Sequence, residues 1–201
     1  EAVKNVLSES EISTIIIRPR TIMGEGRLGI FQILFDWIKA NKNVYVIGSG
    51  NVKFQFIHAY DLMSAYMLIY KTKTSGKFNI GTDSFGTLRG AIENVINYAG
   101  TASKVKSLPE FFTINALRSL DFLGLSPLAP WHYLTYHKEF HFDMSPLIDL
   151  GWKAKYSNDK MFCESYDWFN YNYDKLKYEE KGSPHRMPVK QSILKIVKWL
   201  S

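Results

Sequence analysis

Residues 15–24 read IIIRPRTIMG, and this stretch decides how the rest of the chain is interpreted. The stretch begins within a largely β-branched and apolar run, residues 13–17. Such a run is typical of a short strand buried on both faces of a parallel sheet. Pro19 lacks a backbone N–H, so we expect the strand pairing to stop there. A break of this kind at the carboxyl end of a strand is where open α/β sheets bind ligands.

Strand-like and helix-like segments alternate along the rest of the chain. Strands are predicted at 44–47, 54–58, 77–80 and 104–108, and helices at 30–39, 62–71, 88–98 and 160–173, with a broken helical stretch at 111–138. Asp61 is the predicted N-cap of the helix at 62–71, because an Asp side chain accepts the unpaired N–H groups of a helix start. His58 is interpreted as a structural strand residue. The alternation predicts an α/β fold, with a parallel or mixed sheet covered by helices.

The composition is that of a folded domain with no obvious macromolecular ligand. Of the 201 residues 46% are hydrophobic and 15% aromatic, which is too rich for a disordered chain. The net charge of +6 is modest and does not indicate nucleic acid. No apolar run reaches the roughly 18 residues that cross a bilayer, so no membrane partner is predicted. Cys163 is the single cysteine, which excludes an internal disulfide and favours a reducing compartment, the cytoplasm.

Two regions are predicted from the distribution of polar residues. Residues 1–174 form the main body, and residues 175–201 form a polar linker followed by a short amphipathic helix. Apolar residues recur at helical spacing near the end of the chain, at Ile193, Ile196, Val197 and Leu200. We expect that helix to pack on the body or on a partner, and a basic helix on a membrane surface is the alternative.

Four segments, in order, resemble the second half of the extended short-chain dehydrogenase/reductases, the NAD-dependent epimerase/dehydratase family. They are residues 15–24, the block 48–65 with GSG and FIHAYDL, the FNIG stretch at 78–81, and residues 143–153 with DMS and LGWK. The resemblance implies the last part of a Rossmann-type parallel sheet plus the smaller α/β substrate-binding domain. It also implies NAD or NADP as cofactor, bound mainly by a preceding N-terminal half.

The resemblance further implies which residues face the ligands. In the family the loop after the Arg-Pro pair lies beside the nicotinamide, which carries over to Pro19, Arg20 and Thr21 as cofactor-binding residues. The loop and helix that follow open the substrate pocket, and the predicted substrate contacts are Met23, Gly24, Arg27, Lys53 and Gln55. The planar fork of Arg27 suits a phosphate or carboxylate, although a solvated surface arginine is an equal alternative. Nucleotide-sugar members carry Arg-Asp-Phe where this chain has FQF at 54–56, so the substrate is a sugar nucleotide or something less phosphorylated.

Catalysis in the family depends on a tyrosine and a lysine four residues later, because the lysine lowers the pKa of the tyrosine. The chain contains three matches to this spacing: Tyr156/Lys160, Tyr171/Lys175 and Tyr173/Lys177. All three follow the strand at 13–17, whereas the family's pair precedes it, and residues 1–7 resemble the tail of the helix that carries the pair. The Gly-rich turn that binds the dinucleotide is not found either. We therefore predict no catalytic residue in this chain.

The predicted function is that of the substrate-binding half of an NAD(P)-dependent epimerase, dehydratase or reductase. Its partners would be a small-molecule substrate and an N-terminal Rossmann half, with a homodimer possible. The alternative is a non-catalytic family member or a split-gene product that acts as an interaction module. No metal is predicted, because His132, His137 and His141 lie in an aromatic stretch without the carboxylate or thiolate ligands that zinc would use.

Overall fold

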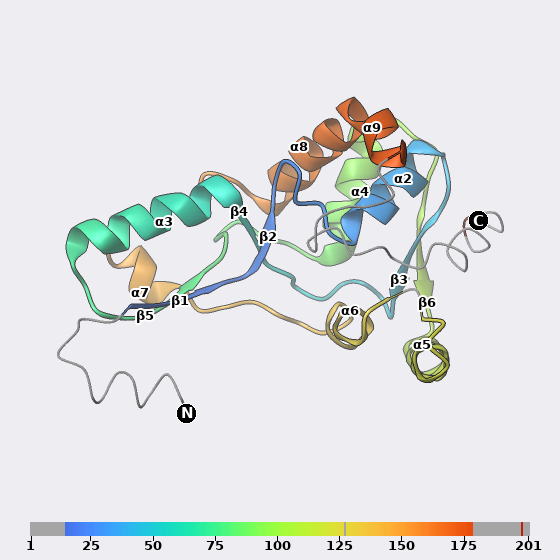
Figure 1. The fold of residues 1–201 in the computed structure, drawn as a ribbon, viewed down its shortest axis with the longest axis horizontal. Helices are drawn as coiled ribbons and strands as arrows, with labels where there is room; N and C mark the ends of the chain where they lie inside the picture. The colour runs from blue at the N-terminus through green and yellow to red at the C-terminus, as the bar shows by residue number, and fades with distance from the viewer. Residues whose placement is uncertain (1–14, 127, 179–197, 199–201) are drawn as a thin grey trace.

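The computed structural model describes residues 15–126, 128–178 and 198, which form three pairs of strands covered by helices (Figure 1). The strands are β1 (Ile15–Pro19), β2 (Thr21–Met23), β3 (Val44–Ile47), β4 (Phe56–His58), β5 (Gly76–Ile80) and β6 (Val105–Leu108). The helices are α2 (Phe31–Lys39), α3 (Ala59–Thr72), α4 (Leu88–Ala99), α5 (Glu110–Phe122), α6 (Pro130–Thr135), α7 (Ser145–Ile148), α8 (Asn158–Tyr171) and α9 (Tyr173–Tyr178). The predicted α/β class is confirmed.

Each strand pair is parallel, and each joins segments that are separated along the chain by helices. β1 pairs with β5, β2 with β4, and β3 with β6. Parallel neighbours need a crossover connection, and here α2 and α3 lie between β1 and β5 in sequence. The carboxyl ends of β1 and β5 therefore lie together, with Pro19 opposite Ile80.

Helix α3 covers the β1–β5 pair, as Figure 1 shows. It buries Leu62, Ala65 and Ile69, which share one face because they are three and four residues apart. The core beneath it also takes residues from β4, β5, α7 and the loop after α7, namely Ile57, Phe78, Ile80, Met144, Leu147 and Trp152.

The second core lies among α2, α4, α8 and strands β3 and β4, and it is rich in aromatic rings. The Phe31 ring meets Phe56 and Phe162 edge to face, with ring centroids 5.3 and 4.9 Å apart. Such T-shaped pairs stabilise beyond the area they bury. Helix α8 adds Tyr166 and Phe169 to this core, whereas Tyr171 at the end of the helix is exposed.

Strand β1 differs from its prediction in extent and in burial. It runs through Pro19, and its three isoleucines are half-buried rather than enclosed on both faces. β5 is the one strand that pairs with it among the described residues, which leaves part of the isoleucine surface exposed. Pro19 stays in the pair because the next residue supplies the donor: the Arg20 N–H binds the Ile80 carbonyl at 2.8 Å.

The N-cap of α3 is His58, so the prediction that Asp61 caps this helix is wrong. His58 has an extended backbone, and its Nδ1 accepts a hydrogen bond from the Tyr60 N–H at 3.2 Å. The Asp61 carboxylate accepts instead from the backbone N–H groups of Lys155 and Tyr156, both at 3.0 Å. Asp61 thus ties the first turn of α3 to the loop that precedes α8.

The predicted linker begins inside a helix, since Lys175 and its neighbours belong to α9. The segments predicted at 1–9 and most of those at 179–201 lie outside the described residues. Lys198 is described, and its Nζ contacts the Asp36 carboxylate at 2.5 Å. Tyr173 donates to the same carboxylate at 3.2 Å, so Asp36 joins α2, α9 and the C-terminal region.

Burial lowers the pKa of His132 to about 4, because the imidazolium loses its hydration inside the protein. The unfolded chain binds this proton near pH 6.5, so stability is fully present above that value and is lost as the pH falls toward 4. We expect His132 alone to lower the free energy of unfolding by about 2 kcal/mol between roughly pH 7 and pH 5.

Urea denaturation of the wild type and of His132→Gln at both pH values measures this contribution. The variant should show a smaller acid-induced loss than the wild type. His141→Gln is the matched control, because it makes the same substitution at a histidine whose side chain is 41% exposed. Equal acid-induced losses in the wild type and His132→Gln would contradict the prediction.

Candidate functional site

The candidate site begins where β1 ends. Pro19 is exposed at the last position of the strand, Arg20 turns into the protein, and Thr21 opens β2. Because β5 is parallel, its carboxyl end meets the same place, where Ile80 leads into Gly81. The three residues predicted to face the cofactor thus lie at the carboxyl edge of a parallel strand pair, which is the ligand-binding edge of open α/β sheets.

Arg20 is a buried cation held by aromatic rings. Its guanidinium lies 3.7 Å from the centroid of the Phe140 ring and about 5 Å from those of Phe54 and Phe142. Its Nε donates to the Gln55 carbonyl at 3.2 Å. Burial lowers the pKa of Arg20 to about 10, which still leaves the group charged at neutral pH.

One hydrogen-bond donor of Arg20 has no acceptor: its Nη2 is buried without a hydrogen-bond partner among the described residues. A buried, unpaired charge is costly, and a ligand oxygen would remove that cost. Arg20 therefore keeps one buried donor that could accept a ligand oxygen as its partner.

Gln55, predicted as a substrate contact, is fully buried and is a structural residue in this conformation. Its amide donates to the Thr82 carbonyl at 2.8 Å and accepts from the Phe142 N–H at 2.9 Å. A Cβ on Gly81 would lie only 2.3 Å from the Gln55 side chain. The glycine of the FNIG stretch is therefore required by the close approach of Gln55.

Of the other predicted substrate contacts, Gly24 and Arg27 lie in the glycine loop after β2, Met23 ends β2, and Lys53 precedes β4. Met23 is 1% exposed, and its side chain packs in the aromatic core. Gly24 is bridged to Arg27, and a side chain at Gly24 would meet His58 Nε2 at 3.2 Å. Arg27 and Lys53 are exposed, which leaves both cations accessible.

Beside this loop the structure brings together a polar cluster that sequence reasoning missed. The His58 ring stacks on Tyr156 with centroids 3.8 Å apart, and its Nε2 lies 3.9 Å from Glu164. Lys160 lies 3.8 Å from the same carboxylate. Burial lowers the pKa of His58, and because Nδ1 accepts a hydrogen bond, we assign the proton of the neutral ring to Nε2. No local spacing links His58 to residues 156–164, so only the folded chain reveals the cluster.

Tyr156 and Lys160 match the spacing of the family's catalytic pair but not its geometry. The Lys160 ammonium lies over the Tyr156 ring, 4.3 Å from its centroid. The pKa of Tyr156 is raised, first by loss of solvent and then by Glu164. A catalytic tyrosine needs the opposite shift.

The three histidines considered as metal ligands contact different groups. His137 lies 3.4 Å from Glu110, and His141 lies 3.4 Å from Glu139. Among the residues that the structure describes, no three His, Cys, Asp or Glu side chains gather closely enough to hold a metal ion. No helix in the same part of the chain is long and apolar enough to cross a membrane.

Comparison with known proteins links the chain to one family. Residues 1–81 match the model of the NAD dependent epimerase/dehydratase family. The protein y4nG of Sinorhizobium fredii (strain NBRC 101917 / NGR234) is 40% identical over 197 residues, which are 98% of this chain and 50% of y4nG. The chain therefore spans about half the length of the curated relative that it matches.

Solved structures share the fold at low sequence identity. The epimerase Mth375 of Methanothermobacter thermautotrophicus aligns with a TM-score of 0.65 at 12% identity, over 88% of this chain and 48% of that protein. The UDP-glucuronic acid 4-epimerase of Bacillus cereus, solved with NAD, aligns with a TM-score of 0.63 at 16% identity, over 85% and 49%. WbmG of Bordetella bronchiseptica, solved with NAD and UDP, aligns with a TM-score of 0.59 at 19% identity, over 85% and 48%.

The fold of these neighbours is the Rossmann-type α/β fold expected from the four sequence blocks, and the first three of those blocks lie within the matched residues. Residues 1–81 thus match the NAD dependent epimerase/dehydratase family, and the described chain shares the fold of solved epimerases at low sequence identity.

Proposed function

We propose that this chain forms the substrate side of an NAD(P)-dependent epimerase, dehydratase or reductase. The nicotinamide cofactor supplies the hydride chemistry when it is bound. Residues of this chain hold and orient the ligands: Pro19, Arg20 and Thr21 on the cofactor side, and Gly24, Arg27 and Lys53 on the substrate side. The residues that bind the rest of the cofactor and move the proton belong, in this proposal, to an N-terminal Rossmann half.

The observation that carries the proposal is the unpaired Nη2 of Arg20 at the carboxyl edge of β1 and β5. The guanidinium is held by rings rather than by a carboxylate, so its charge is available to a ligand. Backbone groups of the Pro19–Thr21 segment and the loop at Gly24 lie next to it along the chain. The chain thus has one buried cation at this strand edge, and Arg27 and Lys53 are exposed cations.

A sugar nucleotide is the substrate class that this charge pattern favours. A diphosphate carries the anionic oxygens that a planar guanidinium binds in bidentate fashion. Two structural neighbours, the UDP-glucuronic acid 4-epimerase and the WbmG complex with UDP, are named for uridine nucleotides. We place the protein in the cytoplasm, where such a cofactor and such substrates are made, and leave a homodimer as a further proposal.

The proposal is tested by titrating the chain with UDP-glucose and, separately, with NAD, while its NMR signals are followed. We expect UDP-glucose to perturb the signals of residues 19–27 and the Nε–H of Arg20. NAD should bind this chain no tighter than about millimolar, because most of its contacts would lie in the other half. No perturbation by UDP-glucose, or a micromolar isotherm with NAD, would show that the division of roles is wrong.

Arg20→Met provides a sharper test of the same site. We expect UDP-glucose affinity to fall roughly tenfold or more, because a hydrogen bond to a charged group is lost. The ligand-free variant should be at least as stable as the wild type, because an unpaired buried charge is replaced by an apolar side chain of similar length. Arg18→Met, on the exposed end of β1, is the control and should change neither property. A strongly destabilised Arg20→Met with unchanged affinity would make Arg20 structural.

A further inference from the structure

Helix α5 (Glu110–Phe122) packs on the body more loosely than any core helix. No side chain on it is buried. The side that faces α6 and β3 carries Thr113, Ile114, Leu117 and Leu120, all half-buried. The remaining surface of the helix is therefore open, although it is not hydrophilic.

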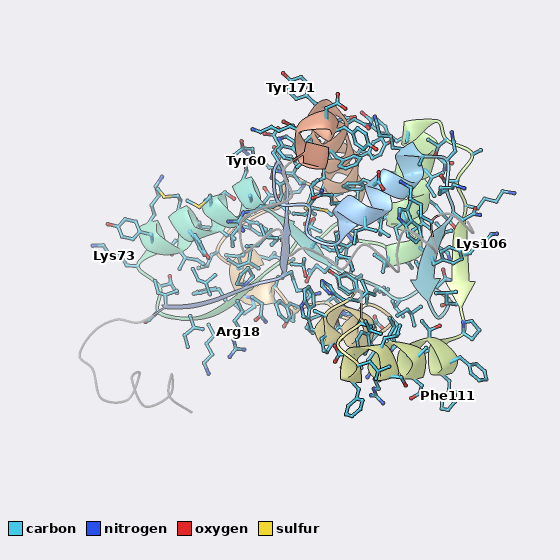
Figure 2. The ribbon with its side chains drawn as sticks, turned by 45° about the vertical axis from the view of Figure 1, so that its right-hand side comes forward. Arg18, Tyr60, Lys73, Lys106, Phe111 and Tyr171 are labelled. Atoms are coloured by element: carbon cyan, nitrogen blue, oxygen red, sulfur yellow. The ribbon has the colours of Figure 1, made fainter. Side chains whose placement is uncertain are left out.

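The open side is dominated by large apolar side chains. We define the α5 outer face as Phe111, Phe112, Asn115, Ala116, Ser119, Phe122 and Leu123. Phe111 and Phe112 are each 73% exposed and Phe122 is 92% exposed. Figure 2 shows Phe111 pointing away from the body of the protein. Leu125, just after the helix, and Trp131 on α6 are each 51% exposed as well. Exposed apolar side chains that cluster as Phe111, Phe112 and Phe122 do along one helix side mark an interaction site.

The two polar side chains within the α5 outer face donate hydrogen bonds within the helix, so these donors need no water as an acceptor. The Asn115 amide donates to the Phe111 carbonyl at 2.9 Å, and the Ser119 hydroxyl donates to the Asn115 carbonyl at 3.0 Å. Both bonds return to the helix's own backbone four residues earlier. This is how such residues are tolerated where the surroundings offer no hydrogen-bond partner.

The charges around the α5 outer face favour an anionic partner. The face itself contains no acidic or basic residue, and the exposed Arg118 borders it one turn before Phe122. Glu110 is directed to His137 at 3.4 Å, and Asp121 lies on the flank of the helix away from the apolar face. The chain as a whole carries a net charge of +6.

We infer that the α5 outer face docks on the surface of a bilayer that contains anionic lipid. A helix with Phe and Leu on one side and a basic residue beside them can lie in the plane of the interface, with its rings at the boundary between headgroups and acyl chains. The sequence predicted no membrane partner because no segment spans a bilayer, but a surface helix needs no span. This inference is independent of the proposed chemistry, which it would place at a membrane surface.

An N-terminal Rossmann half is a poor candidate for covering this face. In that fold the extra strands would continue the sheet at β1 and β5, and Figure 1 shows that pair at the opposite end of the molecule from α5. A second copy of the chain is the other occupant, and the experiment below distinguishes it.

Co-sedimentation of the full chain with vesicles tests the inference. One set of vesicles is an equimolar mixture of phosphatidylcholine and phosphatidylglycerol, and the other is phosphatidylcholine alone. We expect binding to the mixed vesicles that weakens by roughly tenfold or more in F111S/F122S, since two aromatic rings leave the interface. Arg118→Glu should weaken binding to the mixed vesicles by about fivefold or more and have less effect on the neutral ones.

The matched control is M67S/Y70S on the exposed face of α3, where the two side chains are 50% and 76% exposed. It removes a similar apolar surface elsewhere and should bind lipid like the wild type. Circular dichroism and thermal melts should show all variants folded, because the changed residues are exposed. Failure of the wild type to bind the mixed vesicles, or equal binding by F111S/F122S, overturns the inference. A dimer in analytical ultracentrifugation that F111S/F122S abolishes, without lipid binding, assigns the face to a second copy instead.

Discussion

Replacement of Asp61 by alanine should lower the free energy of unfolding by about 3 kcal/mol, the largest effect we expect from a single polar residue of this chain. The side chain is 1% exposed, and its carboxylate accepts the backbone N–H groups of Lys155 and Tyr156. Each hydrogen bond to a charged group contributes roughly 1.5–3 kcal/mol. Alanine leaves both N–H groups without their acceptor and loosens the loop that places Tyr156 on His58.

Urea denaturation of the wild type and of two Asp61 variants measures this effect. Asp61→Asn keeps one side-chain oxygen but loses the charge, so its loss of stability should be intermediate. Asp83→Ala is the control, because Asp83 is exposed and its removal should change stability by less than about 0.5 kcal/mol. If Asp61→Ala is as stable as Asp83→Ala, the contact between α3 and the loop contributes nothing to the fold.

Substitution of Gly81 by alanine should cost about 3 kcal/mol or prevent folding. The added Cβ would lie 2.3 Å from Gln55 Cδ and 2.5 Å from its Oε1, well inside the distance that real Cβ atoms tolerate. Gln55 cannot easily move away, because its amide binds Thr82 and Phe142 and contacts the Met144 sulfur. The overlap must therefore be relieved by a shift of the backbone or by the loss of these bonds.

Thermal and urea melts of two glycine variants separate this clash from a general cost of losing a glycine. Gly86→Ala is the control, because a Cβ there meets nothing within 4 Å and the backbone is not left-handed. A double variant, Gly81→Ala with Gln55→Ala, should be less destabilised than the sum of the two single changes, since the second removes the obstacle. Full additivity would mean that the clash with Gln55 is not the cause.

Local patterns in the sequence predicted the elements well where periodicity alone determines them. The helix predicted at 88–98 is observed at Leu88–Ala99 and ends at Gly100, as the apolar spacing and the glycine indicate. The strand predicted at 44–47 has the bounds of β3, and the FNIG stretch lies in β5 and the turn after it.

Contacts between distant segments were beyond the reach of such patterns. Asp61 has the residue type and position of a helix cap, but its carboxylate accepts hydrogen bonds from backbone N–H groups of the loop before α8. Gln55 has the chemistry of a ligand contact, yet Phe142 and Thr82 enclose it. The aromatic rings around Arg20 come from strand ends and from residues after α6, so nothing near Arg20 in sequence indicates that the guanidinium is buried.

The stack of His58 on Tyr156 has a consequence for how the chain is made. The Gly24 loop lies against His58, and both are synthesised early. Tyr156, whose ring stacks on His58, is synthesised only after α7. Contacts between such distant segments form late, after the chain between them has been translated. A nascent chain halted before Tyr156 would carry strands β1 to β6 with His58 still uncovered, so the polar cluster of His58, Tyr156 and Glu164 should form only when the segment from 156 to 164 has left the ribosome.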